Sequence, residues 1–456
     1  MKIPAVLLTA PASGSGKTLI TCGILKALVN RGLKIASFKC GPDYIDPMFH
    51  GRVIGTKSRN LDTFFTDAPV TRYLFSKNTA DCQAAVVEGV MGYYDGLGGI
   101  KTEGSTYEAA CVLGLPTVLL VNCKGASLSI VALIKGFLEY RQDSRIKAVI
   151  LNRVSPMIYG SLKPLIEQEL GIKVLGYVPE VKECILESRH LGLVLPGEID
   201  ALKEKLDRLA QVLEASVDLD GLLEVAEQRE DLTETSPAIP VLPGADGLKI
   251  AVAKDGAFCF TYLDNLELLE KMGARLVYFS PIEDRSLPEG ISGLLLSGGY
   301  PELHARALSE NRSMLASVRR AVTKGLPCIA ECGGFLYLHR ELEGADGHFY
   351  PMAGVLDAKA FRTDRLSRFG YVTLEANKDQ LLGEAGTAIR GHEFHYWDSG
   401  RCGDGFHARK PVGKREWDCV QSSPTLYAGF PHLFYYSNVQ VPFRFLEKCK
   451  EYQRSC

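Results

Sequence analysis

Short apolar runs alternate with amphipathic segments along the first half of the chain. The runs are nearly continuous, which is typical of strands that are buried on both faces. Segments such as KTLITCGILKALVNRG separate several of them and have the periodicity of amphipathic helices. This alternation predicts a parallel sheet wrapped by helices. The predicted strands are IPAVLLTA, KIASFK, AAVVEGV, PTVLLVNC, KAVILNRV and KVLGYVP.

A polar region separates this series from a second one. The charged segment DALKEKLDRLAQVLEASVDLDGLLEVAEQRE has helical spacing, and DLTETSPAIPVLPGADG after it has the composition of an interdomain linker. A second strand–helix series begins at LKIAVAKD and continues through ARLVYFSP, GLLLSGG and PCIAECGG. The chain is therefore predicted to form two α/β domains, residues 1–235 and 246–456.

Composition excludes several classes of function. The 456 residues, 46% of them hydrophobic, are enough for large cores. The 52 Lys and Arg nearly balance the 54 Asp and Glu, which gives no footprint for nucleic acid or an anionic membrane. No apolar run reaches the roughly 18 residues of a membrane span, and the 13 cysteines are scattered without C-x-x-C pairs or zinc spacing. We therefore expect reduced thiols and a cytoplasmic location.

The N-terminal segment APASGSGKT predicts a phosphate-binding loop, because it follows a strand and precedes a helix. Gly14 and Gly16 allow backbone N–H groups to face phosphate oxygens. Lys17 can reach the outer phosphates, and the Thr18 hydroxyl can ligate Mg²⁺. Pro11 replaces the first glycine of G-x-x-x-x-G-K-[ST], but the groups that carry the chemistry remain.

Polar side chains follow other strands of the first series. Glu88 ends the strand AAVVEG, at the sheet edge where ligands bind, and Asp95 lies in the loop after it. Glu88 is either a Mg²⁺ ligand or the cap of a strand. Asn152 ends VILN, where its amide can recognise an adenine edge or cap a turn or helix.

The segment FKCGPDYIDPMFH supplies a further candidate loop. Its carboxylates, Asp43 and Asp46, suit contact with a metal or a substrate, and Tyr44 and His50 accompany them. The alternative is ordinary turn chemistry, which Gly-Pro-Asp favours.

Cys332 is the sharpest signal in the second half. It lies between a short strand, PCIAE, and a segment predicted to be helical, GFLYLHREL. Such an elbow exposes a nucleophile and directs a helix N-terminus at it. The N–H groups of Gly333 and Gly299 are candidates for an oxyanion hole, and His432 is the candidate base. The alternatives are a buried structural cysteine and a core histidine.

Two other motifs receive weaker interpretations. RGHEFHYWDS contains His392, Glu393 and His395, but it is not H-E-x-x-H and favours a strand, so a structural role is expected rather than a metal site. The three arginines of FRTDRLSRFGY either meet a polycarboxylate or form a solvated basic strand; they are Arg362, Arg365 and Arg368.

Taken together, the motifs resemble the cobyrinic acid a,c-diamide synthase family. Six stretches carry the resemblance in family order: APASGSGKT, FKCGPDYIDPMFH, VVEGVMGYYDG, LSGGYPEL, AECGGFLYL and RGHEFHY. The resemblance implies a dethiobiotin-synthetase-like P-loop domain followed by a class I glutamine amidotransferase domain. The implied activity is that of a carbon–nitrogen ligase that amidates the a and c carboxylates of cobyrinic acid.

Residue roles follow from the same resemblance. Lys17 and Thr18 correspond to phosphate and Mg²⁺ contacts, and Glu88 and Asp43 complete the magnesium set. Asp95 falls in the synthetase site. The substrate loop of the family falls on Tyr44, Ile45 and Asp46.

In the amidotransferase domain, Cys332 corresponds to the nucleophile and His432 to its base. The usual H-x-E of this class would place a glutamate at position 434, where Phe434 stands. The family shares this departure, so a Cys–His dyad is expected, and the group that orients His432 is left open.

The expected partners are ATP, L-glutamine and a corrin or related tetrapyrrole polycarboxylate, with neither nucleic acid nor membrane; a homodimer is left open. Hydrogenobyrinate and nickel sirohydrochlorin remain alternative substrates. An ATP-switched binding protein of the MinD type is disfavoured because Ala12 stands where that type has an extra lysine.

Overall fold

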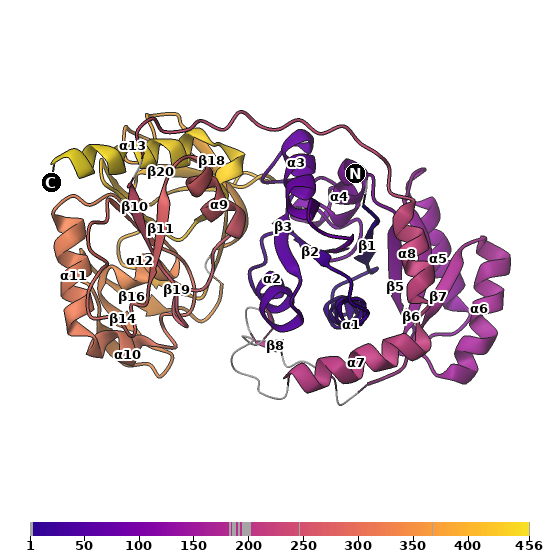
Figure 1. The fold of residues 1–456 in the computed structure, drawn as a ribbon. Helices are drawn as coiled ribbons and strands as arrows, with labels where there is room; N and C mark the ends of the chain where they lie inside the picture. Colours follow the sequence, from indigo (N-terminus) through magenta and orange to yellow (C-terminus); the bar gives the residue numbers. More distant parts are fainter. Residues whose placement is uncertain are drawn as a thin grey trace. The chain divides into compact units, whose positions relative to one another are not determined.

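The computed structural model describes residues 3–181, 184, 188–189, 192–193, 202–245, 247–366 and 368–455. The chain forms two compact units, Met1–Pro237 and Ala238–Cys456, whose elements are labelled in Figure 1. The division falls inside the segment rich in Pro, Ser, Thr and Gly, where few side chains are apolar enough to pack.

The first unit is built on a parallel sheet of seven strands in the order β3-β2-β4-β1-β5-β6-β7. All six strands predicted from the apolar runs are present. The polar edge strand β3 has the sequence KSRNL, which gave no apolar signal. The strands are β1 (Ala5–Thr9), β2 (Ile35–Cys40), β3 (Lys57–Leu61), β4 (Ala84–Glu88), β5 (Thr117–Asn122), β6 (Ile146–Asn152) and β7 (Lys173–Val178), with a two-strand ribbon of β8 (Ser188–Arg189) and β9 (Gly192–Leu193) apart from the sheet.

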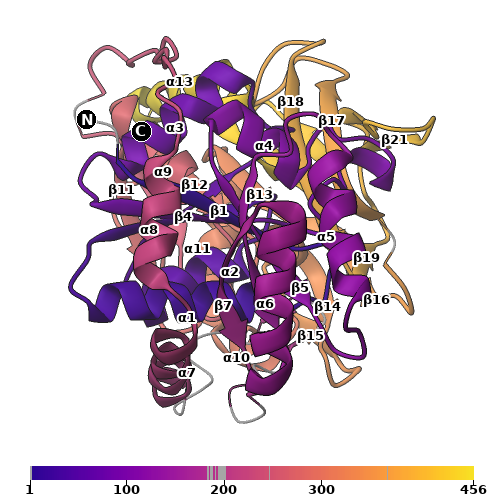
Figure 2. The ribbon, with the colours of Figure 1, turned by 90° about the vertical axis from the view of Figure 1, so that its right-hand side faces the viewer.

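Helices cover both faces of this sheet, which explains why its strands are apolar throughout. Side chains of α1, α7 and α8 form one core cluster with the strands, and α3 to α6 lie across the sheet from them (Figures 1 and 2). The helices are α1 (Lys17–Asn30), α2 (Ile45–Phe49), continued by a π-helical turn (His50–Ile54), α3 (Ala68–Thr79), a 3₁₀ turn (Leu97–Gly99), α4 (Thr106–Leu113), α5 (Ser129–Glu139), α6 (Pro156–Leu170), α7 (Leu202–Ser216) and α8 (Leu219–Glu227).

Strand register brings the predicted polar side chains to one edge of the sheet. Glu88 is paired with Leu8 of β1 on one side and with Lys39 of β2 on the other. Because the strands are parallel, the loops that follow them leave from the same edge, where ligands bind in such sheets. The phosphate loop and the loop after β2 therefore meet beside Glu88.

The second unit contains a six-stranded sheet in the order β11-β10-β12-β13-β23-β22, parallel except for the β22–β23 pair. Its strands are β10 (Lys249–Ala253), β11 (Arg275–Phe279), β12 (Gly293–Leu296), β13 (Cys328–Glu331), β22 (Gln421–Ser423) and β23 (Leu426–Gly429). Its helices are α9 (Leu263–Lys271), α10 (Ala305–Glu310), α11 (Arg312–Thr323), α12 (Gly333–Tyr337) and α13 (Gln440–Ser455), with a 3₁₀ turn at Tyr435–Ser437.

Two further sheets extend this unit, and the strand–helix pattern did not predict them. One has the order β15-β14-β16-β19 and the other β21-β20-β17-β18-β24. Their strands are β14 (His339–Glu343), β15 (Phe349–Pro351), β16 (Leu356–Arg362), β17 (Arg368–Ala376), β18 (Ala388–His395), β19 (Trp397–Ser399), β20 (Phe406–Arg409), β21 (Glu416–Cys419) and β24 (His432–Leu433).

The prediction that GFLYLHREL is helical throughout is wrong. The helix α12 ends at Tyr337, and strand β14 begins at His339. The buried ring of His339 bonds the Phe335 carbonyl at 2.8 Å and the Ser399 hydroxyl at 2.7 Å. The tertiary hydrogen bond to Ser399 overrides the helical propensity of the segment.

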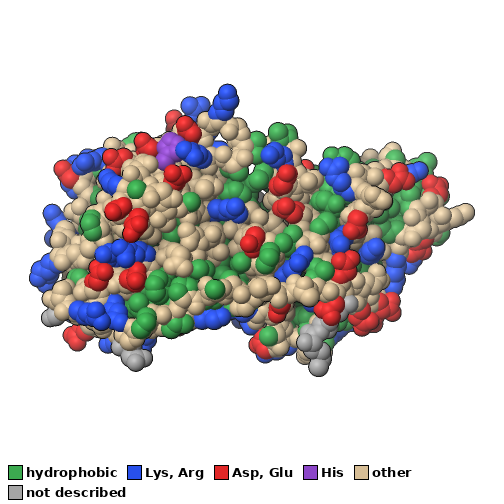
Figure 3. Space-filling model, turned by 90° about the horizontal axis from the view of Figure 1, so that it is seen from above, with side chains coloured by type: hydrophobic (Ala, Val, Ile, Leu, Met, Phe, Trp, Pro, Cys, Tyr) green, Lys and Arg blue, Asp and Glu red, His purple; other side chains and the backbone are tan. Residues whose placement is uncertain are grey.

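Among the described residues, every helix is too short or too polar to span a bilayer. Figure 3 shows Lys and Arg interspersed with Asp and Glu over one face of the molecule. This mixture agrees with the nearly balanced charge of the sequence.

Candidate active sites

The phosphate loop connects β1 to α1 and has the backbone that its glycines predict. Gly14 and Gly16 have φ values of 76° and 90°, in the left-handed region that favours glycine. A Cβ on Gly16 would lie 2.6 Å from Nδ2 of Asn152. That Nδ2 donates a hydrogen bond to the Ser15 carbonyl at 2.8 Å, so the end of β6 supports the loop directly. Recognition of adenine by Asn152 stays a prediction.

Lys17 begins α1 with its ammonium directed back at the loop. Its Nζ donates to the carbonyls of Ala12 and Met91. Burial, helped by the charge of Lys39, lowers the pKa of Lys17 to about 8, although Glu88 opposes the shift. These carbonyls hold the ammonium at the loop, where an outer phosphate would offer it a negative partner.

Glu88 is the centre of a buried ionic cluster and is 0% exposed. Its Oε1 accepts hydrogen bonds from the Thr18 hydroxyl at 2.6 Å and from Lys39 Nζ at 2.7 Å. His50 Nε2 lies 3.4 Å from its Oε2, and Lys39 also pairs with Asp46 at 2.5 Å. The cluster therefore joins β4, the phosphate helix, β2 and the loop after β2.

Charge pairing decides which of the two carboxylates in this cluster stays ionised. Burial alone would raise the pKa of Glu88, but Lys39 and His50 overcome it and leave that pKa well below its usual range. Burial and the charge of Asp43 raise the pKa of Asp46 to about 8, against the opposing effect of Lys39. Glu88 is thus the carboxylate that stays charged.

Sequence reasoning missed Lys39, although a signal was present. It lies between Phe38 and Cys40 in a strand that is buried throughout, and a buried lysine needs an anionic partner. The partner could not be named before the order of β2 and β4 in the sheet was known.

The remaining predicted residues of the first unit lie in the neighbouring loops. Asp43 Oδ1 accepts hydrogen bonds from the N–H groups of Ile45, at 2.8 Å, and Asp46, at 3.2 Å, so it starts α2. Tyr44 is half-buried and precedes this helix. Asp95 Oδ2 accepts from the Gly92 N–H at 3.0 Å, which fixes the loop after β4. The metal, substrate and synthetase roles of these residues stay predictions.

The oxygen atoms at Glu88 suit a hard divalent cation. Glu88 Oε2 is buried and has no hydrogen bond, and the Thr18 hydroxyl contacts the other oxygen of the same carboxylate. Carboxylate and hydroxyl oxygens are ligands that Mg²⁺ prefers. Within the described ranges, no group of three or more His, Cys, Asp or Glu forms a complete metal site from such side chains alone.

Cys332 lies at the predicted elbow of the second unit. It follows β13, precedes α12 and has φ 47° and ψ −100°, a strained conformation for a residue with a Cβ. Its N–H donates to the Gly429 carbonyl of β23 at 2.8 Å, which holds the turn. The residue is 7% exposed. Burial and nearby Glu302 raise the pKa of the thiol above its usual range, and the Gly333 N–H opposes them.

The two glycines predicted for the oxyanion hole lie next to each other. A Cβ on Gly333 would be 3.0 Å from the backbone nitrogen of Gly299. A Cβ on Gly299 would meet the Ala257 carbonyl oxygen at 2.1 Å, so only glycine fits there. Two backbone N–H groups beside the nucleophile are the components of an oxyanion hole.

His432 and Cys332 lie near the same pair of glycines, Gly298 and Gly299. A Cβ on Gly298 would lie 2.3 Å from Cε1 of the His432 ring, and Gly299 beside it adjoins Gly333. The ring is 3% exposed, and burial, with a contribution from His395, lowers the pKa of His432 to about 3. A neutral imidazole is the form that accepts a thiol proton.

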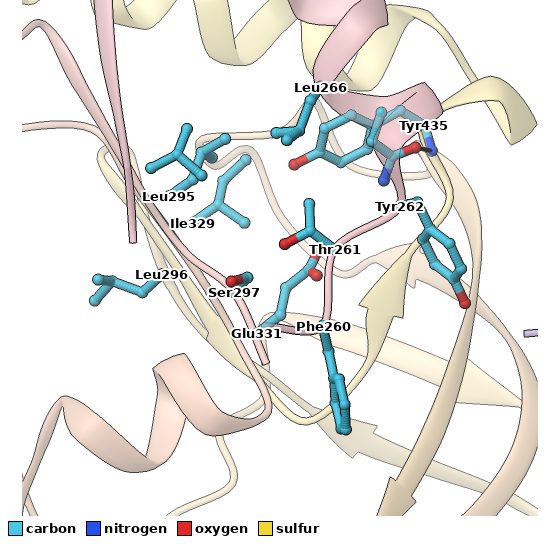
Figure 4. A pocket seen from close by; sticks show the side chains of 12 residues that line it. Phe260, Thr261, Tyr262, Leu266, Leu295, Leu296, Ser297, Ile329, Glu331 and Tyr435 are labelled. Atoms are coloured by element: carbon cyan, nitrogen blue, oxygen red, sulfur yellow. Dashed lines mark hydrogen bonds between the residues drawn. The ribbon is translucent and has the colours of Figure 1, made fainter. Parts of the chain in front are cut away.

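Sequence reasoning missed Glu331, the last residue of β13. Its Oε2 is 3.8 Å from His432 Nδ1, and its side chain borders a cavity of about 30 Å³ (Figure 4). An acidic residue directly before the nucleophile, in the otherwise apolar strand CIAE, was the available signal. At the H-x-E position, Phe434 packs edge-to-face on Tyr262, with ring centroids 5.2 Å apart.

The RGHEFHYWDS segment is extended, as predicted, and contributes the end of strand β18 and the whole of β19. His392 is paired in register with His432, and His395 stacks on Phe430 with centroids 3.7 Å apart. The segment thus packs beside His432. The basic segment is not a single strand: β16 ends at Arg362 and β17 begins at Arg368, with Arg365 in the intervening loop.

Sequence comparisons assign each unit to a family of domains. Residues 6–194 match the CobQ/CobB/MinD/ParA nucleotide binding domain, and residues 249–418 match the CobB/CobQ-like glutamine amidotransferase domain.

Relatives match this chain over nearly its whole length. A cobyrinate a,c-diamide synthase of Caldanaerobacter subterraneus subsp. tengcongensis is 38% identical, and the match covers 97% of each chain. The proteins of the same name from Listeria innocua and Thermoplasma volcanium are 39% and 37% identical. Those matches cover 96% and 100% of this chain and 97% and 99% of the relatives.

Proposed function

Because the chain belongs to the cobyrinate a,c-diamide synthase family, we propose that it amidates the a and c side-chain carboxylates of cobyrinate in cobalamin biosynthesis. ATP activates each carboxylate and glutamine supplies the nitrogen. The observation that carries this proposal is the presence in one chain of two sites, a phosphate loop beside buried Glu88 and a strained cysteine elbow beside His432.

The first unit uses ATP to activate the substrate carboxylate. A carboxylate resists attack by ammonia because oxide is a very poor leaving group, so transfer of the γ-phosphoryl group of ATP first forms an acyl phosphate. Lys17 and the N–H groups of the phosphate loop hold the phosphates during this transfer. Mg²⁺, when bound by Thr18 and Glu88, would neutralise phosphate charge. Ammonia then displaces inorganic phosphate and leaves the amide.

The second unit releases the nitrogen. Cys332 sulfur attacks the side-chain amide carbon of glutamine, and His432 takes the thiol proton and passes it to the departing ammonia. The N–H groups of Gly299 and Gly333 stabilise the oxyanion of the tetrahedral intermediate. Water hydrolyses the resulting thioester to glutamate. Ammonia must reach the acyl phosphate unprotonated, and direct transfer between the two sites is part of the proposal.

Product analysis tests the proposal. The full chain is incubated with ATP, Mg²⁺ and glutamine and with cobyrinate, hydrogenobyrinate or nickel sirohydrochlorin in parallel. Mass spectrometry should find a product of cobyrinate in which two acids have become amides. The absence of any amide product from cobyrinate, with glutamine or with ammonia, would overturn the assignment. Preferred turnover of another tetrapyrrole would correct its substrate.

A further inference from the structure

Glu331 and His432 face each other across the β13 elbow. Side chains alternate along β13: Cys328 and Ala330 join the main core of the unit, whereas Ile329 and Glu331 border the small cavity on the other face. This alternation directs the carboxylate away from the core and toward β24. The distance from Glu331 Oε2 to His432 Nδ1 is 3.8 Å. Contacts of this length in an active site without substrate commonly shorten when the reacting complex forms.

The same carboxylate also holds the backbone of the histidine segment. Glu331 Oε1 accepts the N–H of Leu433, directly after His432, at 3.2 Å. Asn265 of α9 donates to the Leu433 carbonyl at 2.8 Å and accepts the Tyr435 N–H at 2.9 Å. The two side chains thus hold the backbone of Leu433 at both its N–H and its carbonyl. Of the two, only Glu331 also presents an oxygen to the imidazole ring.

The surroundings of Glu331 make its contact with His432 sensitive to the protonation of the imidazole. Figure 4 shows Glu331 beside Thr261 and Ser297, with Leu266, Leu295 and Ile329 around the same small cavity. Burial raises the pKa of Glu331 to about 8, against the opposing effect of the Leu433 N–H. In such surroundings a neighbouring cation strongly stabilises an ionised carboxylate. Here the cation is the imidazolium of His432, which exists only while the ring carries the thiol proton.

We propose that Glu331 is the positioning residue of the glutaminase site, in the role that the glutamate of H-x-E has in other class I amidotransferases. This inference rests on the proposed function. In its ionised form, which the forming imidazolium stabilises, the Glu331 carboxylate keeps the proton of neutral His432 on Nδ1, so that Nε2 is the nitrogen that accepts the Cys332 proton. When that proton arrives, the ring becomes an imidazolium paired with Glu331; the proton leaves with ammonia, and the pair returns to its starting charges.

The test compares Glu331→Gln with the wild-type chain. The amide of the variant keeps an oxygen that can accept the Leu433 N–H. It removes the negative charge that faces Nδ1 of His432. We expect kcat for glutamine hydrolysis to fall about 10- to 100-fold with KM for glutamine within about twofold, because the lost interaction forms with the imidazolium. Amidation with added ammonia should be unchanged. Glu331→Asp, which keeps the charge, should retain more activity than Glu331→Gln.

A second measurement is independent of turnover. Iodoacetamide alkylation of the peptide that contains Cys332, followed by mass spectrometry, should be slower in Glu331→Gln, because the imidazolium that accompanies the thiolate has lost its counter-charge. Equal rates of glutamine hydrolysis and alkylation in the wild type and Glu331→Gln would overturn the positioning role. A parallel loss of the ammonia reaction would show a general structural effect instead. Failure of the wild type to amidate cobyrinate with ammonia would count against the proposed function. The positioning role of Glu331 would then be judged from the alkylation rates alone.

Discussion

Each unit has a glutamate at the carboxyl end of a central parallel strand, fully buried in the first unit and with a side chain 12% exposed in the second, and the two glutamates have opposite electrostatic environments. Glu88 contacts an ammonium, Lys39, at 2.7 Å, and its pKa lies well below its usual range. Glu331 faces an imidazole at 3.8 Å, and its pKa is raised to about 8. A permanent cation keeps the first carboxylate charged, as the phosphate and metal chemistry proposed for it requires. The second carboxylate meets a cation only when His432 is protonated, which suits the proton transfer proposed for it.

Removal of the nucleophile should separate the two sites most strongly. Cys332→Ala should lower glutamine-dependent amidation by more than about 10³-fold, because no other group can form the thioester. Amidation with added ammonia should persist, since the phosphate loop is unaltered. Both rates are measured by product mass spectrometry. Loss of both reactions together would contradict the division of labour between the units.

Neutralising Glu88 should give the converse result. Glu88→Gln should lower amidation about 100-fold with either nitrogen source, because the charge that orders the cation and Lys39 is gone. Glutamine hydrolysis should continue in the same preparation. Glu103→Gln, which changes an exposed glutamate of the first unit, is the control and should have no effect. Equal activity of the Glu88 and Glu103 variants would remove Glu88 from the site.

The buried cluster should also dominate the stability of the first unit. Lys39→Met leaves Glu88 and Asp46 buried without their cation, and loss of one partner of such a cluster costs about 3 kcal/mol or more. Urea denaturation followed by circular dichroism measures the change. The matched control is Lys34→Met, which breaks the exposed pair with Asp81 and should leave the midpoint unchanged. Similar midpoints for the two variants would show that the cluster does not stabilise the fold.

The smallest expected effect is the pH dependence of the second unit. Folded Glu331, with its pKa raised to about 8, keeps its proton over most of the neutral range, whereas an unfolded glutamate releases it near its ordinary pKa of 4.5. The unfolded state therefore binds fewer protons in this window, so the contribution of Glu331 to stability falls as pH rises. Between pH 6 and pH 8, Glu331→Gln should lose less stability than the wild type, by about 2 kcal/mol. Thermal denaturation at both pH values tests this, and parallel pH curves would contradict it.

Local sequence patterns were sufficient for the parts of the fold that depend on neighbouring residues. Apolar runs identified six of the seven strands of the first sheet, and the small residues before Lys17 identified the phosphate loop. The Cys332 elbow was predicted from a strand that is followed by Cys-Gly-Gly. In each case the backbone conformation is fixed within a few residues of the signal.

What the sequence could not supply was the identity of partners distant along the chain. Lys39 and Glu88 meet because β2 adjoins β4, and Glu331 meets His432 because β13 ends beside β24. The two further sheets of the second unit were missed for a related reason. Their strands carry mixed polar and apolar residues, and α12 gives way to β14 where His339 forms a hydrogen bond with Ser399, which is 60 residues away.

Gly298 offers a way to recognise related proteins that cannot use glutamine as the nitrogen donor. Its backbone is outside the left-handed region, so its own conformation would accept any residue, yet even a methyl group there would collide with the His432 ring. The constraint comes wholly from the imidazole. A related protein with alanine or a larger residue at this position must therefore have moved or abandoned its general base. Reading that one position in related genomes should separate enzymes that draw nitrogen from glutamine from those that depend on free ammonia.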